Sequence, residues 1–447
     1  MLRWLARAGA QQSVRKLAIV LLLPNVAWAF SLPATPVLRA DASRVLAATP
    51  RCPRSRTTLL GLRQSASKTG SADPGLVFNH RDAGKFADDR FGNPVVRRYR
   101  EKTEDGMFEN WRMWYHGRDI DFDPTVFKAP TGRVGLAESP DGITWRSIDG
   151  DEDQGSVLEP NSDEWWGYDT THSGVGDVQS INTDKVRGAD ENQGSVQFMY
   201  CFGGDTEDVD VGGLEMGGKA VPAGTTIQGL RMRIGLCLSF DGVHWTRLEG
   251  DHHSGALFDV GAEGEWDSLY NAWPTVIQHA KNDFRMYYTA FDPNTNKFSI
   301  GLARSADGIK WTKEGKVLEG GGAGAFDERG CSRRCVLPDP NTNGGYLMYV
   351  EGISAAGTHS IGLYISPDGL SWQQTSDSPV LSGAEDSEAW DHGSVSSPWI
   401  VPIPEDGSCR LYYSAGGDSG ASGIGMARSL GKDWTTFTKY QHNPTGA

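Results

Sequence analysis

The 447-residue sequence has little helical periodicity, little positive charge in its body, and no Asn-x-Ser/Thr acceptor site. Helical periodicity is hard to find beyond the first 30 residues, which argues against a helical fold. The missing acceptor sites disfavour a glycosylated extracellular protein. The first 70 residues hold 11 basic residues and one acid, which leaves the rest of the chain with a formal charge of −24. Nucleic acid and anionic membranes are approached through positive surface, so this acidity argues against both as partners.

Cysteines are also sparse and carry no metal signature. Six are scattered along the chain. Cys201 and Cys237 fall on neighbouring expected strands and are expected to lie close together. Cys331 and Cys335 are four residues apart on one expected strand, too distant to pair with each other. None has a zinc-ligand spacing, so we expect no metal and no cofactor.

The most abundant feature of the sequence is one repeated sequence motif, called here the repeated phrase. It first occurs as Gly135-Leu-Ala-Glu-Ser-Pro-Asp-Gly-Ile-Thr-Trp145 and returns at 235–245, 301–311, 362–372 and, in a degraded form, 425–434. Self-similarity at a spacing of roughly 60 residues indicates one supersecondary unit used repeatedly. An aromatic, alternating run precedes each phrase, as in Arg285-Met-Tyr-Tyr-Thr289, and this pattern is typical of a strand.

Each repeat is predicted to form four short antiparallel strands. The Ile-Gly-Leu-Ala-x-Ser part alternates as a strand does, Asp-Gly supplies a tight turn, and the Trp packs over the hairpin. These residues recur in every copy, whereas a catalytic group is needed once, so we interpret them as structural. Five such sheets arranged radially make an all-β, five-bladed β-propeller. Residues 75–79 are expected to close the ring in the last blade, although 437–440 could supply the same strand.

The repeat resembles the blades of the arabinanase, levansucrase and invertase superfamily of five-bladed glycoside hydrolases. Both combine an aromatic-Asp step, a Pro-anchored strand, a Tyr-Tyr strand and the Ser-x-Asp-Gly-x-x-Trp phrase, here over residues 75–440. The sialidase Asp box, Ser-x-Asp-x-Gly-x-x-Trp, differs from this phrase by one position and ranks lower. The resemblance implies that a carbohydrate or sugar-derived small molecule binds in the central funnel.

The catalytic carboxylates of that superfamily are missing from their usual places, just before the Pro of the inner strand. Asn93 precedes Pro94, the second blade offers Val175-Gly176, and the third reads Ala272-Trp273-Pro274. Asn, Val and Ala cannot act as a general base or nucleophile. Any hydrolysis must therefore use other carboxylates.

Residues two apart on a strand share a face, so further positions can face the funnel. The catalytic candidates are Asp89, Asp177 and Glu351, with Glu351 as general acid if its surroundings raise its pKa. The candidates for substrate binding vary between blades and are Asn93, His172, Asn271, Trp273, Glu328, Arg329, Arg333 and His392. Trp273 is expected to stack on a sugar face and Arg333 to bind a hydroxyl or carboxylate. Each could instead be structural, for example Arg329 or Arg333 paired with Glu328.

Two functions stay open. The favoured one is a glycoside hydrolase-like plastid enzyme that acts on a carbohydrate, for which Asp89 and Asp177 must face one pocket with carboxyl groups about 5–9.5 Å apart. The alternative is a non-catalytic propeller that binds a sugar, a pigment-like small ligand or a protein partner. An acidic or phosphorylated ligand suits the Arg329–Arg333 pair better than a neutral glycan does. The oligomeric state is not predicted.

The N-terminal residues are similar to a two-part targeting sequence. Arg15 and Lys16, the apolar run 17–23 and the small residues of 26–29 form the pattern of a signal peptide, 1–29. The run is too short for a membrane anchor, so no membrane insertion is expected after processing. Residues 30–72 have a transit-peptide composition and are expected to be disordered.

The junction Ala27-Trp-Ala-Phe30 resembles the Ala-x-Ala-Phe junction of presequences in algae with secondary plastids. We therefore predict a plastid protein whose propeller spans 73–447. Secretion is the alternative, and it leaves the acid-free stretch of 42–70 unexplained. Within the propeller, the Gly-rich, acidic segment 203–229 is expected to be a mobile excursion between two strands of the second blade, either a lid over the funnel or, as we favour, a disordered segment without structure of its own.

Overall fold

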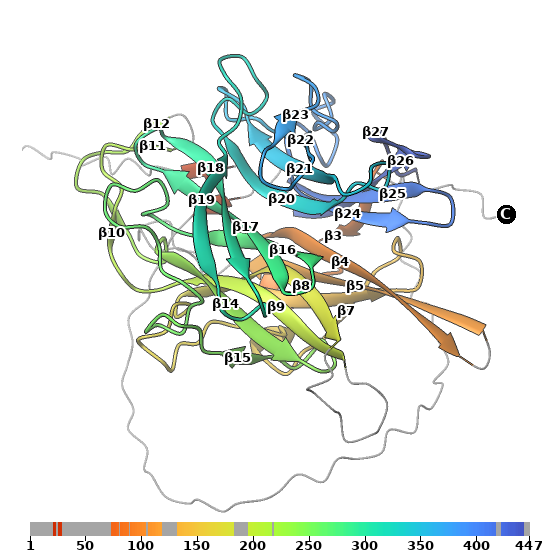
Figure 1. The fold of residues 1–447 in the computed structure, drawn as a ribbon, viewed down its shortest axis with the longest axis horizontal. Helices are drawn as coiled ribbons and strands as arrows, with labels where there is room; N and C mark the ends of the chain where they lie inside the picture. Colours follow the sequence, from red (N-terminus) through yellow and green to blue (C-terminus); the bar gives the residue numbers. More distant parts are fainter. Residues whose placement is uncertain are drawn as a thin grey trace, which may run out of the picture.

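The computed structural model describes residues 21–23, 26–28, 73–79, 81–88, 90–103, 106–118, 132–182, 195–216, 219–416 and 422–441. This part of the chain is almost entirely β-structure and forms five antiparallel sheets that follow one another in chain order, as the colours of Figure 1 show. The first strands of successive sheets contact one another, so the sheets are the blades of a five-bladed propeller around a central channel. The predicted fold class is confirmed.

Each of the five sheets, blades I to V, has four strands in the order of the chain, and a fifth strand, β3 (Leu76–Asn79), joins the sheet of blade V. Blade I contains β4 (Arg90–Thr103), β5 (Gly106–Arg118), β6 (Arg133–Ser139) and β7 (Arg146–Ile148). Blade II contains β8 (His172–Asn182), β9 (Ser195–Gly204), β14 (Met232–Ser239) and β15 (Thr246–Leu248). Blade III contains β16 (Ala272–Ala280), β17 (Asp283–Asp292), β18 (Lys297–Ser305) and β19 (Thr312–Leu318). Blade IV contains β20 (Cys331–Pro338), β21 (Tyr346–Ile353), β22 (His359–Ser366) and β23 (Gln373–Gln374). Blade V contains β24 (Val395–Ile403), β25 (Ser408–Gly416), β26 (Ser422–Leu430) and β27 (Asp433–Lys439).

A few short elements lie outside the blades. β1 (Leu21–Leu23) pairs with β2 (Val26–Trp28), and two 3₁₀ turns, η1 (Lys85–Ala87) and η2 (Asp153–Gly155), flank blade I. None of the helical segments in the described ranges has the length and hydropathy of a membrane span. Apart from β1 and β2, the predicted signal peptide and transit segment lie outside the described residues.

The ring is closed in blade V by both of the segments that the sequence offered. β3 (Leu76–Asn79) pairs with the start of β26, and β27 pairs with its end. The two segments meet where the Gly75 amide donates to the Tyr440 carbonyl at 2.7 Å. Phe78 is buried in the core beside Phe91 and Tyr115 of blade I, so the N-terminal strand also joins the last blade to the first.

The repeated phrase is a structural device in the blades where it is intact. In blade I the Ser139 hydroxyl accepts the Gly142 amide, and Asp141 Oδ1 accepts the Ile143 and Thr144 amides. Gly142 has φ +71°, a conformation that glycine tolerates without a Cβ clash. The Gly142 carbonyl then accepts the Tyr412 hydroxyl of blade V at 2.7 Å. Equivalent bonds join blades I and II, II and III, and III and IV, from Trp114 to Gly242, Tyr200 to Gly308 and Tyr287 to Gly369.

The Gly-rich segment between β9 and β14 differs from its expectation. It contains two small ladders, β10 (Val209–Asp210) with β13 (Thr226–Ile227) and β11 (Glu215–Met216) with β12 (Lys219–Ala220). Its buried valines and Ile227 pack in one cluster with Trp273 and Phe298 of blade III. The expectation of an excursion without structure of its own was wrong because a few apolar side chains among many glycines suffice to anchor it.

Candidate functional site

The central channel has two ends with different structures. The first strands β4, β8, β16, β20 and β24 all begin at one end, here called the top end, and finish at the other, the bottom end. Each of these strands has a register shift against its neighbour close to the top end. Such bulges redirect side chains and are over-represented next to functional sites.

Three of these irregular positions also have a strained backbone. Asn93, Trp273 and Ser397 have φ of 56°, 48° and 52°, a left-handed region that costs a non-glycine residue about 1–3 kcal/mol. Each is followed by proline, the pattern that the sequence showed at Asn93 and Trp273. The three missing-carboxylate positions, Asn93, Val175 and Ala272, all lie at the register shifts of the top end, and none of them is an acid.

Glu351 is held at the top end by three partners. It is buried and pairs with Arg333 Nη1 at 3.0 Å, lies 2.6 Å from His359 Nδ1 and accepts the Ser397 amide at 3.0 Å. Burial raises the pKa of Glu351, but Arg333, His359 and the Ser397 amide outweigh burial and lower it to about 2. Glu351 therefore does not meet the condition set for a general acid, which must be protonated near neutral pH.

Arg333 and Trp273 contact each other at the top end. The Arg333 guanidinium lies 4.5 Å from the centre of the Trp273 ring, a cation–π contact, and both side chains are buried. Phe202 packs 5.0 Å from the same ring. The ring expected to stack on a sugar is thus in contact with groups of the protein itself.

Asp177 is a connector between blades I, II and III. Its Oδ1 pairs with Arg97 Nη2 at 2.5 Å, and its Oδ2 accepts Gln179 Nε2 at 2.9 Å and the Val276 amide at 2.8 Å. The carboxylate is fully buried. Asp89, its expected partner, lies outside the described residues, so the carboxyl spacing that would indicate a glycosidase stays untested.

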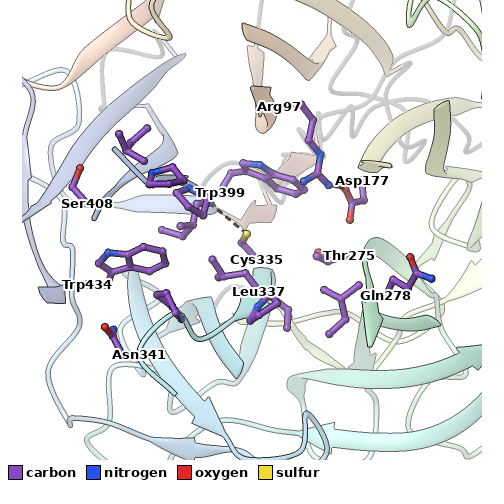
Figure 2. Close-up of a pocket in the computed structure, with 18 of the residues that line it drawn as sticks. Arg97, Asp177, Thr275, Gln278, Cys335, Leu337, Asn341, Trp399, Ser408 and Trp434 are labelled. Atoms are coloured by element: carbon purple, nitrogen blue, oxygen red, sulfur yellow. Dashed lines mark hydrogen bonds and ion pairs between the residues drawn. The ribbon is translucent and has the colours of Figure 1, made fainter. Parts of the chain in front are cut away.

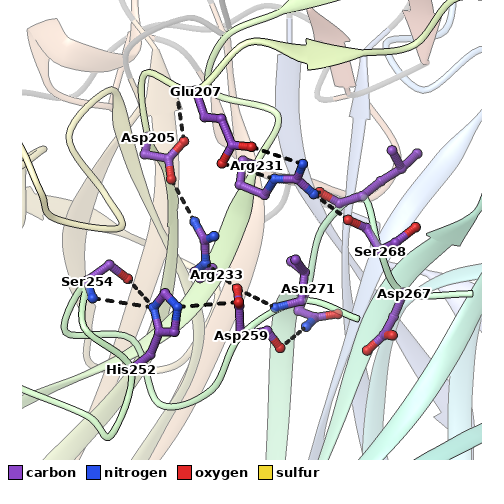
Figure 3. A network of polar contacts seen from close by, with 12 residues as sticks. Asp205, Glu207, Arg231, Arg233, His252, Ser254, Asp259, Asp267, Ser268 and Asn271 are labelled. Carbon is purple, nitrogen blue, oxygen red and sulfur yellow. Dashed lines mark hydrogen bonds and ion pairs between the residues drawn. The ribbon is translucent and has the colours of Figure 1, made fainter. Parts of the chain in front are cut away.

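Asn271 and His172 have structural contacts. Asn271 belongs to the polar network of Figure 3, where its Nδ2 donates to the Asp259 carbonyl at 3.2 Å. The same network pairs Arg233 with Asp205 and Asp259 at 2.6 and 2.8 Å, which fixes the loops at the top of blade II. His172 is buried with Nε2 2.9 Å from the Gly229 carbonyl, and burial lowers its pKa to about 4.

The remaining predicted residues lie in turns. Arg329 pairs with Glu215 at 2.8 Å, Glu328 accepts the Gly324 amide of its own turn, and His392 Nδ1 is 3.1 Å from the Ala384 carbonyl. The expected pairing of Glu328 with Arg329 or Arg333 is not among the ion pairs of the described residues. Cys201 and Cys237 are close, as predicted, with sulfur atoms 3.6 Å apart and both thiols free.

Two cavities flank these residues along the channel. The top one has a volume of about 50 Å³ and is lined by Arg90, Asn93, Arg118, Arg333, Ser397 and Ser414, among others. The bottom one has a volume of about 720 Å³ and is lined from all five blades, with Arg97 and Asp177 at one side and Trp434 at the other (Figure 2). In the described part of the chain, no group of three or more His, Cys, Asp or Glu side chains is placed to hold a metal ion.

Several residues of these sites were not found from the sequence. Ser397 precedes Pro398 and so carried the same signal as Asn93 and Trp273. His359 begins a third strand, and its contact with Glu351 depends on the side-chain packing of blade IV, which no local pattern shows. Arg97 and Trp399 belong to ordinary strand patterns, so nothing in the sequence distinguished them.

Comparisons with known proteins support the fold. No protein-family model and no curated protein sequence matches the chain. Among solved structures, the chain is similar to an N-acetylgalactosamine deacetylase from F. plautii in complex with blood group B trisaccharide. The TM-score is 0.51 and the sequence identity is 17%, and the match covers 80% of this chain and 94% of that chain. It is also similar to a thermostable family-43 glycoside hydrolase, with a TM-score of 0.50, 14% identity, and coverage of 80% and 95%. A glycosyl hydrolase from Bacteroides ovatus gives a TM-score of 0.50, 15% identity, and coverage of 82% and 96%.

These likenesses place the chain among five-bladed propellers with the architecture of glycoside hydrolases, and the predicted resemblance in fold is confirmed. At such identities the likeness establishes the fold alone. The two matches of different activity, a deacetylase and a glycoside hydrolase, also indicate that this fold hosts more than one reaction.

Proposed function

We propose that this protein is a non-hydrolytic propeller that binds an acidic carbohydrate, or an acidic sugar derivative, at the top end of its channel. The observation that carries the proposal is the state of the two described candidate carboxylates. Asp177 and Glu351 are both buried in ion pairs with arginine, and the pKa of Glu351 is lowered to about 2. A glycosidase needs one carboxyl group that is protonated near neutral pH, and Glu351 does not fit that role.

An acidic ligand is favoured by the lining of the top cavity. Three arginines, Arg90, Arg118 and Arg333, line it together with Ser397 and Ser414, and Arg333 also pairs with Glu351. Guanidinium matches carboxylate geometry in two parallel hydrogen bonds. A volume of about 50 Å³ compares with ~30 Å³ for a water molecule in the liquid. The cavity therefore suits a carboxylate group, with the sugar ring bound outside it.

A carbohydrate is supported by the fold neighbours. One of them was crystallised with a trisaccharide, and two others are glycoside hydrolases. These neighbours add support for the ligand class, whereas the acidic group follows from the arginines of this chain.

Binding can be tested by thermal shift and calorimetry with glucuronate and galacturonate against glucose and galactose. We expect the sugar acids to raise the melting temperature, because a ligand of the native state stabilises it by mass action, and the neutral sugars to have no effect. Arg90→Gln should weaken sugar-acid binding, whereas Arg304→Gln, which removes an arginine paired with Glu314 in blade III, should not. Equal responses to acid and neutral sugars, or unchanged binding by Arg90→Gln, would contradict the proposal.

We also propose that the protein is imported into a secondary plastid, on the evidence of the leader residues alone. A fluorescent fusion that carries residues 1–72 should reach the plastid stroma, and Phe30→Ala should stop it before the stroma. A fusion with the intact leader that is found outside the cell would support secretion.

A further inference from the structure

The bottom cavity differs from the site proposed above in both size and lining. Its volume of about 720 Å³ lies in the range of about 300–1,000 Å³ typical of small-molecule sites. Its walls are largely apolar and include Ile277, Leu337, Trp399, Ile400, Ile403 and Trp434. Walls of this kind offer few hydrogen-bond partners to the hydroxyl groups of a sugar, so they suit a different class of ligand.

One cation is held in place at the channel side of this cavity. Arg97 donates from Nε to the Val178 carbonyl at 2.6 Å and from Nη2 to Asp177, and its guanidinium lies 5.1 Å from the Trp399 ring centre. These contacts fix the group, while its side chain stays 31% exposed. No hydrogen bond of Nη1 occurs among the described residues. Figure 2 shows Arg97 at one side of the cavity, so its guanidinium is a fixed cation beside the space that a ligand would fill.

The channel carries one further positive charge, that of Arg334, which lies outside the lining of this cavity. Arg97 and Arg333 are matched by Asp177 and Glu351, but Arg334 has no ion pair in the described part of the chain. Arg334 is buried, its Nη2 donates to the Trp273 carbonyl, and its Nε and Nη1 have no partner there. Burial and the neighbouring Arg333 lower its pKa to about 9, so it stays protonated at neutral pH. An uncompensated buried cation favours a bound anion nearby.

We propose that the bottom cavity binds a small molecule with a flat, largely apolar body and a single anionic group. The anion pairs with Arg97, and the body lies along the apolar wall that runs from Trp399 to Trp434 (Figure 2). Lys432 at the rim of the cavity is exposed and supplies a second positive charge for the approach of the ligand. This site is separate from the top cavity and does not depend on the function proposed for it.

A pair of fluorescent probes that differ by one charge tests the proposal. 8-Anilinonaphthalene-1-sulfonate has a flat apolar body and a sulfonate, and N-phenyl-1-naphthylamine has the same body without the charge. We expect both to bind the full chain with a stoichiometry of one, and the sulfonate to bind at least tenfold more tightly. Because partly unfolded proteins also bind the sulfonate probe, binding must be accompanied by a higher melting temperature.

Substitutions of residues that line the cavity test whether the probes bind there. Ile403→Trp fills the apolar wall and should abolish binding of both probes, and Arg97→Gln should remove the preference for the sulfonate. Lys432→Gln should slow sulfonate association, whereas Lys310→Gln, an exposed lysine in blade III, should not. Arg97 also pairs with Asp177, so Arg97→Gln could prevent folding. In that case Ile403→Trp still tests whether the probes bind in this cavity. Equal affinity for the two probes, or binding unaffected by Ile403→Trp, would overturn the proposal.

Discussion

The two ends of the central channel are formed by the same five strands, yet they differ in strain, charge and space. At the top end the strands have bulges, three non-glycine residues have positive φ, and a cavity of about 50 Å³ is lined by arginines. At the bottom end only β16, among the five first strands, has a register shift, between Gln278 and Ala280, and the cavity there has a volume of about 720 Å³ and largely apolar walls. The blades supply a symmetric frame, and the positions that break the symmetry determine what each end can bind.

The difference also bears on catalysis. At the top end the buried acid Glu351 is already paired with Arg333 and His359, so that end is held together by its charges. At the bottom end the guanidinium of Arg97 is a fixed cation beside the cavity. The fold is compatible with more than one reaction, and the charge pairing of this chain is the basis of the proposal that the channel binds rather than hydrolyses.

The largest expected effect is the loss of the top-end ion pair. Glu351→Gln leaves the buried Arg333 without its counter-charge, and we expect the free energy of unfolding to fall by about 3–5 kcal/mol. Glu314→Gln is the matched control, since its ion pair with Arg304 lies on the surface, and it should leave stability unchanged. Urea denaturation measures both. A small loss for Glu351→Gln would mean that the pair does not hold the top end.

The next effect is a dependence of the unfolding free energy on pH, caused by His172 at the top end. The pKa of His172 falls from 6.5 to about 4 on folding because the ring is buried, so the unfolded chain binds more protons between these values. Its contribution to stability is therefore complete above pH 6.5 and is lost as the pH falls towards 4, by about 3 kcal/mol. His172→Gln should flatten the dependence of the unfolding free energy on pH in this window. Equal slopes in His172→Gln and the unchanged chain would contradict the assignment.

The parts of the fold and of the site that could be predicted are those whose contacts lie close together in the sequence. The blades were predictable because Ser139, Asp141 and Gly142 form a local turn that returns in other copies, and local bonds leave a local pattern. The top-end positions Asn93 and Trp273 were found because each precedes a proline on a first strand.

The partners of the candidate residues could not be predicted in the same way. Glu351 contacts Ser397 of the next blade, and Asp177 contacts residues of blades I and III. Whether a carboxylate is free or paired depends on such contacts between distant strands. Segment 203–229 was predicted to lack structure because it is rich in glycine. The few apolar side chains that pack in one cluster with Trp273 are spread among those glycines and form no periodic pattern.

A smaller effect is expected where the middle of the channel meets the bottom cavity. Thr275 lines that cavity, and its hydroxyl donates to the Arg334 carbonyl at 3.0 Å. Thr275→Val removes this bond at nearly constant volume, and we expect a loss of about 1 kcal/mol in the free energy of unfolding. Because the substitution leaves Arg97 in place, the preference for the sulfonate probe should persist. A loss as large as that of Glu351→Gln would show that the two ends do not differ in sensitivity.

The central claim is that the channel binds without hydrolysing, and turnover of glycosides tests it most directly. The measurement is release of the aryl group from a panel of aryl glycosides, and of monosaccharide from arabinan, sucrose and levan, by the full chain. The account predicts no release above the uncatalysed rate, because Asp177 and Glu351 are both held in ion pairs. Rapid release that is lost in Asp177→Asn or Glu351→Gln, while the variant stays folded at the assay temperature, would contradict it.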